Sequence, residues 1–242
     1  MRDIFNTCHV PPRVANSVRA HLLVLQTRCL PTRASTVHAP APSRYHTVMV
    51  TIRTSETHPI RVDFIDPRLL PVPGRLGLTL APGKKCASSL ANVVWERNLQ
   101  ADLKRLRDVY ATQVLVSLME DVEYEACSIP HLLSDAGYLG MQVVHFPIPD
   151  LLVPELHQEQ GFEGLTRHLS ERLELGENVV VHCLGGLGRS GLLAAAILVA
   201  RGMAADEAIA AVRKARQGAV ETRRQEEYLR HFAAGIHAAG AA

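Results

Sequence analysis

Cysteines are scarce in this sequence, and none is placed to pair with another or to bind a metal. The five are odd in number and scattered along the chain: Cys8, Cys29, Cys86, Cys127 and Cys183. No CxxC pair or His/Cys cluster is present, which argues against structural zinc and against a disulfide framework. We therefore expect a reducing compartment, the cytoplasm, and no metal site.

An apolar run long enough to cross a membrane is also missing. Residues 192–200 are apolar, but they are too few for a membrane span and are typical of a buried helix. Hydrophobic residues make up 47% of the chain and charged residues 21%, as in a soluble globular protein. With 242 residues the chain can form one sizeable domain or two small ones, and we expect no membrane association.

Acidic residues are nearly absent from the first 48 positions. This segment contains six arginines and a single acid, Asp3, whereas the remainder holds 20 basic and 23 acidic residues. Because the remainder is not basic, nucleic acid is a poor candidate partner.

Residues 1–48 also lack sustained hydrophobic periodicity, and several prolines interrupt them. Their Arg-rich, acid-poor composition resembles an organelle transit peptide. Alternatively, translation begins at Met49 and the extension comes from gene prediction, which is the interpretation we favour. Disorder over 1–48 is expected under either interpretation, so we predict a disordered or mispredicted extension over 1–48 and a single domain over 49–242.

The remaining sequence alternates between strand and helix patterns. Apolar residues predict strands at 76–80, 113–118, 141–146 and 178–181 and helices at 97–108, 124–136, 162–173, 192–201, 205–216 and 223–236. This alternation is typical of an α/β fold, with a central, mostly parallel sheet flanked by helices. In such sheets, ligands bind beyond the carboxyl ends of the strands.

A glycine-rich turn follows the last predicted strand. Residues 184–188 read Leu-Gly-Gly-Leu-Gly, and an apolar helix comes next. Backbone N–H groups in such a turn, together with the N-terminus of the helix, form a site for an anion, most simply phosphate. The turn lacks the Gly-Lys-Ser/Thr triplet of nucleotide-binding loops and the third glycine of a dinucleotide fingerprint.

Two side chains at the ends of this turn can make the anion site reactive. A helix N-terminus and the Arg189 guanidinium would favour the thiolate form of Cys183, which is a nucleophile. Arg189 can also hold two phosphate oxygens, and Ser190 can donate a hydrogen bond to the sulfur. We predict phosphoryl transfer to Cys183 followed by hydrolysis, with phosphate bound by Leu184, Gly185, Gly186, Leu187, Gly188, Arg189 and Ser190. The alternative is a structural cysteine beside a tight turn.

A carboxylic acid for the leaving oxygen is predicted upstream. The strand ending at Phe146 leads into Pro147-Ile148-Pro149-Asp150, which places Asp150 at the same edge of the sheet. Breaking a phosphate monoester requires a proton for the departing oxygen, and Asp150 could supply it. Asp121, at the end of another strand, is the reserve candidate. We expect Lys84 and Lys85 to lie in solvent, the alternative being that they lie near a phosphorylated partner, and we expect Arg216 to be part of a solvated helix face.

The motif His182-Cys183 through Arg189-Ser190-Gly191 resembles the signature loop of the cysteine-dependent protein tyrosine and dual-specificity phosphatases. The segments HCLGGLGRS, HFPIPD and GAVETRRQEEYL resemble, in order and spacing, the kinase-associated phosphatases, which act on cyclin-dependent kinases. The resemblance covers roughly residues 75–232. It implies a phosphatase without cofactor, a phosphorylated protein as partner, and Gln225 at the position of a glutamine that orients the attacking water. We expect a monomer.

Two other functions remain open at this point. The same chemistry could serve a phosphoinositide or an RNA 5′-phosphate, although the uncharged residues at 184–188 argue against a strongly anionic substrate. A phosphopeptide-binding module that has lost turnover is the non-catalytic alternative. Cys183, Arg189 and Asp150 are all present, which argues against it.

Overall fold

The computed structural model describes residues 50–86 and 92–240, so the predicted extension over 1–48 lies outside the described residues. The main sheet has the order β2-β3-β7-β5-β6, in which only the β2–β3 pair is antiparallel. Its strands are β2 (Asp63–Phe64), β3 (Leu76–Thr79), β5 (Thr112–Ser117), β6 (Gln142–His145) and β7 (Asn178–His182). The predicted α/β fold with a mostly parallel sheet is confirmed. A separate parallel pair joins β1 (Thr51–Thr54) to β4 (Val93–Glu96).

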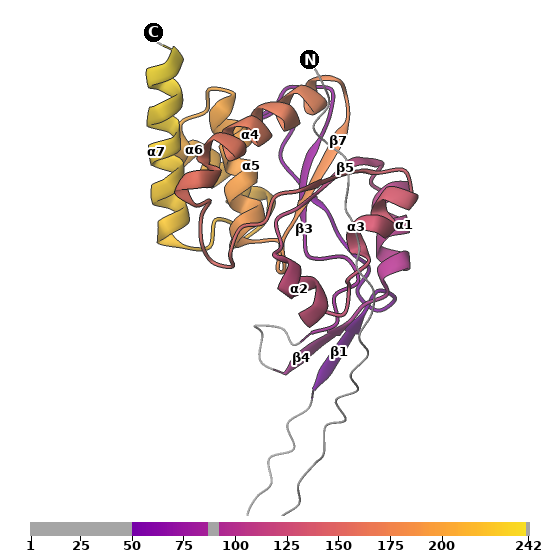
Figure 1. Ribbon diagram of the computed structural model, residues 1–242. Helices are drawn as coiled ribbons and strands as arrows, with labels where there is room; N and C mark the ends of the chain where they lie inside the picture. Colours follow the sequence, from indigo (N-terminus) through magenta and orange to yellow (C-terminus); the bar gives the residue numbers. More distant parts are fainter. Residues whose placement is uncertain (1–49, 87–91, 241–242) are drawn as a thin grey trace, which may run out of the picture. The chain divides into compact units, whose positions relative to one another are not determined.

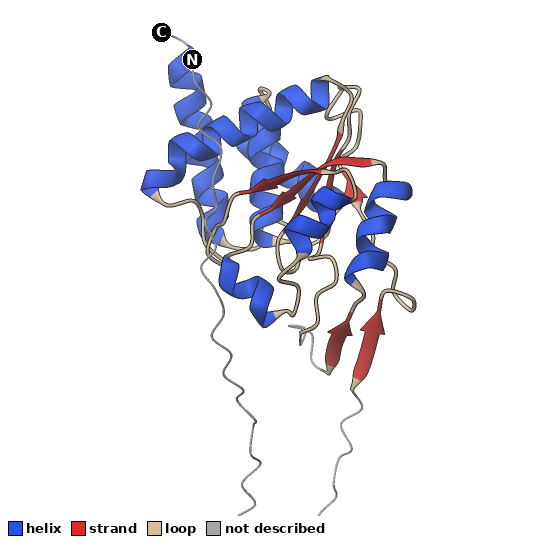
Figure 2. Ribbon diagram, turned by 45° about the vertical axis from the view of Figure 1, so that its right-hand side comes forward, coloured by secondary structure: helices blue, strands red, loops and turns tan. Residues whose placement is uncertain are grey.

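Helices cover both faces of the main sheet (Figures 1 and 2). On one face α4 and α5 pack on β7, and α6 and α7 pack against α5, while α1 and α3 cover β5 and β6 on the other face. The helices are α1 (Leu99–Asp108), α2 (Asp121–Ala126), α3 (Leu132–Tyr138), α4 (Glu159–Glu174), α5 (Gly188–Ala200), α6 (Ala205–Ala215) and α7 (Arg223–Gly240), with a short 3-10 turn at Leu156–Gln158.

The three valines of β7 belong to two hydrophobic cores, one on each face of the sheet. Val179 and Val181 point into the core beneath α4 and α5, whereas Val180 points into the core beneath α1 and α3. Successive side chains of a strand point to opposite faces, so an unbroken apolar run identifies a strand that is buried on both sides. The position of β7 between β3 and β5 explains why all three valines are fully buried.

Four of the few aromatic residues form one cluster on the α4–α7 side of the sheet. Phe162 of α4 lies 5.8 Å, ring centre to ring centre, from each of Phe146, Tyr228 and Phe232. Phe162 is fully buried, and its neighbours come from the end of β6 and from α7. The cluster therefore fixes the C-terminal helix against the rest of the molecule.

Two local predictions need correction. The predicted helix over 124–136 is two helices, α2 and α3, because Pro130 between them lacks an N–H and disfavours helical backbone at Ile129. The helix after the glycine-rich turn begins at Gly188 rather than at Leu192, so that Arg189 and Ser190 lie in its first turn.

Candidate active site

The glycine-rich turn lies at the carboxyl edge of the sheet, between the ends of β3 and β5. Cys183 directly follows β7, and its residue is 3% exposed. The backbone N–H of Gly186 donates a hydrogen bond to Cys183 Sγ over 3.3 Å. The chain then enters α5, a 13-residue helix whose N-terminus carries partial positive charge. The sulfur therefore lies at the N-terminus of α5 and receives one backbone N–H group.

The turn leaves no room for a side chain at Gly186. Its φ is +71°, and a Cβ atom there would lie 2.1 Å from the Thr79 carbonyl oxygen of β3. A Cβ on Gly188 would lie 3.1 Å from Gln225 Nε2, whereas a Cβ on Gly185 would meet nothing within 4 Å. Close packing inside the protein thus accounts for Gly186 and partly for Gly188, but not for Gly185.

Arg189 is fully buried and points back under the neighbouring strand ends. Its NH1 and NH2 groups donate to the two Glu123 carboxylate oxygens over 2.5 and 2.7 Å, and NH1 also donates to the carbonyl oxygens of Leu118 and Ile148. Burial alone would lower the pKa of Arg189, but the hydrogen bonds with Glu123 and the negative groups Cys183, Glu123 and Asp150 raise it above its ordinary value. The guanidinium is therefore a fixed positive charge.

Asp150 lies beside the same guanidinium. Its Oδ1 is 2.8 Å from Arg189 NH2, and its side chain is 55% exposed. The loop after β6 thus brings Asp150 to the 183–189 loop, as the sequence predicts, with its carboxylate open to solvent. Asp121, the reserve candidate, is the exposed first residue of α2.

Glu123 is a site residue that sequence reasoning missed. It is the third residue of α2, which follows β5 after a short loop, and it holds Arg189 through two hydrogen bonds. Its Oε2 also accepts a hydrogen bond from the Glu120 backbone N–H. The Glu-x-x-Glu pattern at a strand end, which is typical of a capped helix start, is the signal that could have drawn attention to it.

Two basic residues that were expected in solvent instead contact the turn. Lys84 is 6% exposed, and its Nζ donates to the Leu184 carbonyl oxygen over 3.1 Å. Arg216 NH2 donates to the Gly185 carbonyl oxygen over 2.9 Å, and its NH1 lies 2.6 Å from Asp63 Oδ2. The solvent prediction is wrong for both residues. It fits Lys85, whose side chain is 45% exposed.

Comparisons with known proteins found similar sequences and structures, most of them described as phosphatases. The family model "Tc-R-P: Polymorphic toxin system, DSP-PTPase phosphatase" matches residues 91–203. Cyclin-dependent kinase inhibitor 3 of Rattus norvegicus is 29% identical over 180 residues, which cover 73% of this chain and 80% of that protein. The solved structure of kinase associated phosphatase with its catalytic-site cysteine changed to serine has a TM-score of 0.64 and 26% identity, and the match covers 74% of this chain and 97% of that one. Tk-PTP in its active form is 31% identical with a TM-score of 0.53, over 72% of this chain and 96% of that chain.

The chain belongs to the cysteine-dependent tyrosine and dual-specificity phosphatases. The family resemblance of the signature loop is thereby confirmed, and the protein is a protein phosphatase.

Gln225 is a buried residue of this phosphatase. Its Oε1 accepts hydrogen bonds from the backbone N–H groups of Glu221 and Thr222 over 3.0 and 3.2 Å, and its Nε2 donates to the Leu152 carbonyl oxygen over 3.1 Å. The amide lies next to Gly188, so the structure brings Gln225 to the 183–189 loop. It joins the start of α7 to the loop that carries Asp150.

Ser190 and His182 lie next to the 183–189 loop, and within the described residues Ser190 Oγ and His182 Nε2 are buried without a hydrogen-bond partner. In the described residues Ser190 Oγ is buried and makes no hydrogen bond, so the bond expected from it to Cys183 Sγ is not formed. His182 is fully buried, and its Nδ1 lies 3.4 Å from the Cys183 carbonyl oxygen.

Cys86, outside the glycine-rich turn, is a thiol whose pKa is lowered. The hydrogen bond with the Cys127 thiol, supported by the Lys84 charge and opposed by burial, lowers the pKa of Cys86 to about 6. The same hydrogen bond, together with burial, raises the pKa of Cys127. Cys86 is therefore a rival to Cys183 that an experiment on the nucleophile must exclude.

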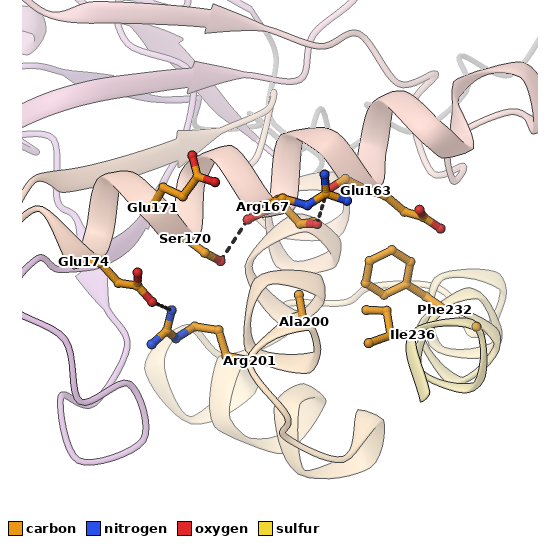
Figure 3. A pocket seen from close by; sticks show the side chains of 11 residues that line it. Glu163, Arg167, Ser170, Glu171, Glu174, Ala200, Arg201, Phe232 and Ile236 are labelled. Carbon is orange, nitrogen blue, oxygen red and sulfur yellow. Dashed lines mark hydrogen bonds and ion pairs between the residues drawn. The ribbon is translucent and has the colours of Figure 1, made fainter. Parts of the chain in front are cut away.

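Other features of the described residues are separate from this site. A hollow of about 650 Å³ lies between α4, the end of α5 and α7, with Phe232 and Ile236 on one wall and the Arg201–Glu174 ion pair on another (Figure 3). None of the predicted site residues lines it. Within residues 50–86 and 92–240, no helix has the length and apolar character needed to cross a membrane, and no group of three or more His, Cys, Asp or Glu side chains could hold a metal ion.

Proposed function

We propose that this phosphatase hydrolyses phosphate monoesters on proteins with Cys183 as its nucleophile. One observation carries the assignment. The Cys183 sulfur receives the Gly186 N–H at the N-terminus of α5, and the Arg189 guanidinium at the other end of the same loop is already paired with Asp150. A thiolate, an anion cradle, a fixed cation and a carboxyl group are the parts that two-step phosphoryl transfer requires.

In the first step the Cys183 thiolate attacks phosphorus, a sulfur–phosphorus bond forms and the bond to the leaving oxygen breaks. The N–H groups of residues 184–190 and the Arg189 guanidinium stabilise the charge on the other phosphate oxygens. An incoming phosphate replaces Asp150 as the partner of Arg189 NH2, which now lies 2.8 Å from Asp150 Oδ1. Released from that ion pair, Asp150 takes up a proton from solvent and gives it to the leaving oxygen, which departs as an alcohol.

In the second step water attacks the cysteinyl-phosphate, Asp150 takes a proton from that water, and Cys183 leaves as a thiolate. We assign Gln225 to positioning this water, because its amide lies against Gly188 within the same site. One hydrogen of its Nε2 is bound to the Leu152 carbonyl, which fixes the direction of the other. The residues present carry out both steps without a cofactor.

Protein phosphomonoesters fit the loop better than polyanionic substrates do. Between Cys183 and Arg189 the loop contains only leucine and glycine, so it offers a single guanidinium to the phosphate. The similar rat protein is named as an inhibitor of cyclin-dependent kinases, which supports a phosphorylated protein kinase as the first substrate to test. The three cysteines that the structure describes are free, which supports a reducing location such as the cytoplasm.

A paired substitution tests the nucleophile. Cys183→Ser should reduce turnover of p-nitrophenyl phosphate by at least about 10³-fold, because the hydroxyl is a far poorer nucleophile than the thiolate. Binding of tungstate, a phosphate mimic, should persist and can be measured by calorimetry.

The matched control is Cys86→Ser, which removes the other thiol whose pKa is lowered. It should retain activity close to that of the unmodified chain. Loss of turnover in Cys86→Ser together with activity in Cys183→Ser would reverse the assignment.

A further inference from the structure

Lys84 is a buried cation with no carboxylate partner in the described part of the chain. Its residue is 6% exposed and takes part in none of the ion pairs there. The Nζ group donates to one carbonyl oxygen, that of Leu184, and lies 5.1 Å from the centre of the Trp95 ring. A buried ammonium with no carboxylate partner is costly, and because this one lies behind an anion-binding turn, a bound phosphate would stabilise it.

The contact with Leu184 also determines which way a loop peptide faces. In a trans peptide the carbonyl oxygen and the following N–H point in opposite directions. Lys84 Nζ and the Ala81 N–H, at 3.1 and 3.3 Å, both hold the Leu184 oxygen on the outer side of the loop. The N–H of Gly185 is therefore directed to the inner side, where phosphate would bind.

The peptide between Gly185 and Gly186 has the same arrangement, with its oxygen held outward and its N–H directed inward. Arg216 NH2 holds the Gly185 oxygen on the outer side over 2.9 Å, and the following N–H, that of Gly186, points at Cys183 Sγ over 3.3 Å. Two cations outside the loop thus direct two successive N–H groups inward. Arg216 is neutralised by Asp63, at 2.6 Å, whereas Lys84 has no such partner.

We propose that Lys84 is a positioning residue for the phosphatase reaction. It holds the Leu184 carbonyl outward, so that the Gly185 N–H faces the phosphate, and it places a positive charge behind the loop. The proposal rests on the proposed function, since it assumes that phosphate binds on the inner side of the 183–189 loop.

The groups that face Lys84 leave its charge available. They are Cys86, Cys127, Cys183 and Arg97, and the last is paired with Asp102 at 2.7 Å. Burial lowers the pKa of Lys84, and the three thiols act in the opposite direction. Cys86, whose pKa is lowered to about 6, is the largest of these opposing influences, and a phosphate held on the inner side of the 183–189 loop would add a further negative charge near Lys84.

A rigid turn explains why Lys84 rather than Lys85 faces inward. Gly83 has a φ of +72°, a Cβ atom there would lie 2.6 Å from Leu99, and its N–H donates to Asp102 Oδ2 over 2.9 Å. Lys85 points outward, with its Nζ 3.7 Å from Glu96. The two adjacent lysines therefore form a natural test pair.

The experiment compares Lys84→Met with Lys85→Met. For p-nitrophenyl phosphate, kcat/KM should fall tenfold or more in Lys84→Met and stay within twofold of the unmodified chain in Lys85→Met. In a Cys183→Ser background, calorimetry should show at least tenfold weaker tungstate binding for Lys84→Met. The thermal midpoint of Lys84→Met should not fall, because the substitution removes an unpaired buried charge.

Equal kcat/KM and equal tungstate affinity in the two variants would overturn the role of Lys84 and leave the proposed function intact. A wild-type chain that turns over no phosphate ester would instead refute the proposed function. If Lys84→Met does not fold, Lys84→Gln takes its place. That variant keeps an N–H donor but lacks the charge, so tungstate binding as tight as in Lys85→Met would contradict the proposal.

Discussion

At the scale of single residues, the burial of His182 next to Cys183 determines the protonation state of the His182 ring. The side chain is fully buried at the end of β7. Burial, with smaller effects of Arg189 and His145, lowers the pKa of His182 from 6.5 to about 4. The ring is therefore neutral at neutral pH and adds no charge of its own to the 183–189 loop.

This shift predicts a pH dependence of stability. A histidine whose pKa is lower in the folded state stabilises the fold above pH 6.5, and that contribution is lost as the pH falls to about 4. The shift corresponds to a loss of about 3 kcal/mol over this interval. Urea denaturation at pH 7.5 and pH 4.5 should show that His182→Gln loses less stability on acidification than the unmodified chain. The control is His231→Gln, at an exposed position on α7, which should follow the unmodified chain.

At the scale of elements, α2 has a larger role than its six residues suggest. It begins directly after the end of β5 and directs Glu123 toward Arg189, while most of its other side chains face solvent. The Glu123 carboxylate also binds the Glu120 N–H at the helix start over 2.8 Å. The start of the helix and the orientation of the Arg189 guanidinium therefore depend on the same side chain.

Glu123→Gln should impair catalysis. An amide keeps the shape of the side chain but offers one acceptor oxygen in place of two, so Arg189 loses one of its charge-assisted hydrogen bonds. We expect kcat/KM for p-nitrophenyl phosphate to fall roughly tenfold to a hundredfold, by analogy with the loss of other groups that hold a catalytic side chain in position. Glu125→Gln, on an exposed face of the same helix, is the control. Equal activity in the two variants would show that Glu123 is dispensable.

At the scale of the whole molecule, one buried ion pair joins four segments. Arg97 and Asp102 are each 1% exposed, and Arg97 Nε and NH2 donate to the two Asp102 oxygens. Arg97 NH1 also reaches the His58 carbonyl oxygen, and Asp102 accepts the Gly83 N–H. The pair therefore anchors the turn that carries Lys84 to α1 and to the segment before β2.

Asp102→Asn should destabilise the molecule strongly, because it leaves the Arg97 charge buried without its counter-charge. The expected loss is about 3 kcal/mol in the free energy of unfolding, measured by urea denaturation. Asp108→Asn breaks the Arg107–Asp108 pair, whose side chains are 41% and 54% exposed, and should change stability far less. Similar losses in the two variants would argue against a special role for the buried pair.

The sequence alone was sufficient for the parts of this protein whose chemistry is local. Cys183, the glycines and Arg189 lie within seven consecutive positions, so their spacing predicts one anion-binding loop without knowledge of the fold. The apolar periodicities predict the α/β class because buried strands and amphipathic helices leave different patterns. Asp150 could be placed at the loop because parallel strands end at a common edge.

Only the tertiary structure decided which other residues reach that loop. Glu123 lies 66 positions from Arg189, and Lys84 lies 100 positions from Leu184. Whether a charged side chain is solvated or buried depends on the segments packed around it, and no local pattern records that. Lys84 and Arg216 are therefore predicted as solvated residues from the sequence, and only the family resemblance assigned Gln225 to the site. The fold buries Lys84 and Gln225 and partly buries Arg216, because the strand ends bring distant turns together around the 183–189 loop.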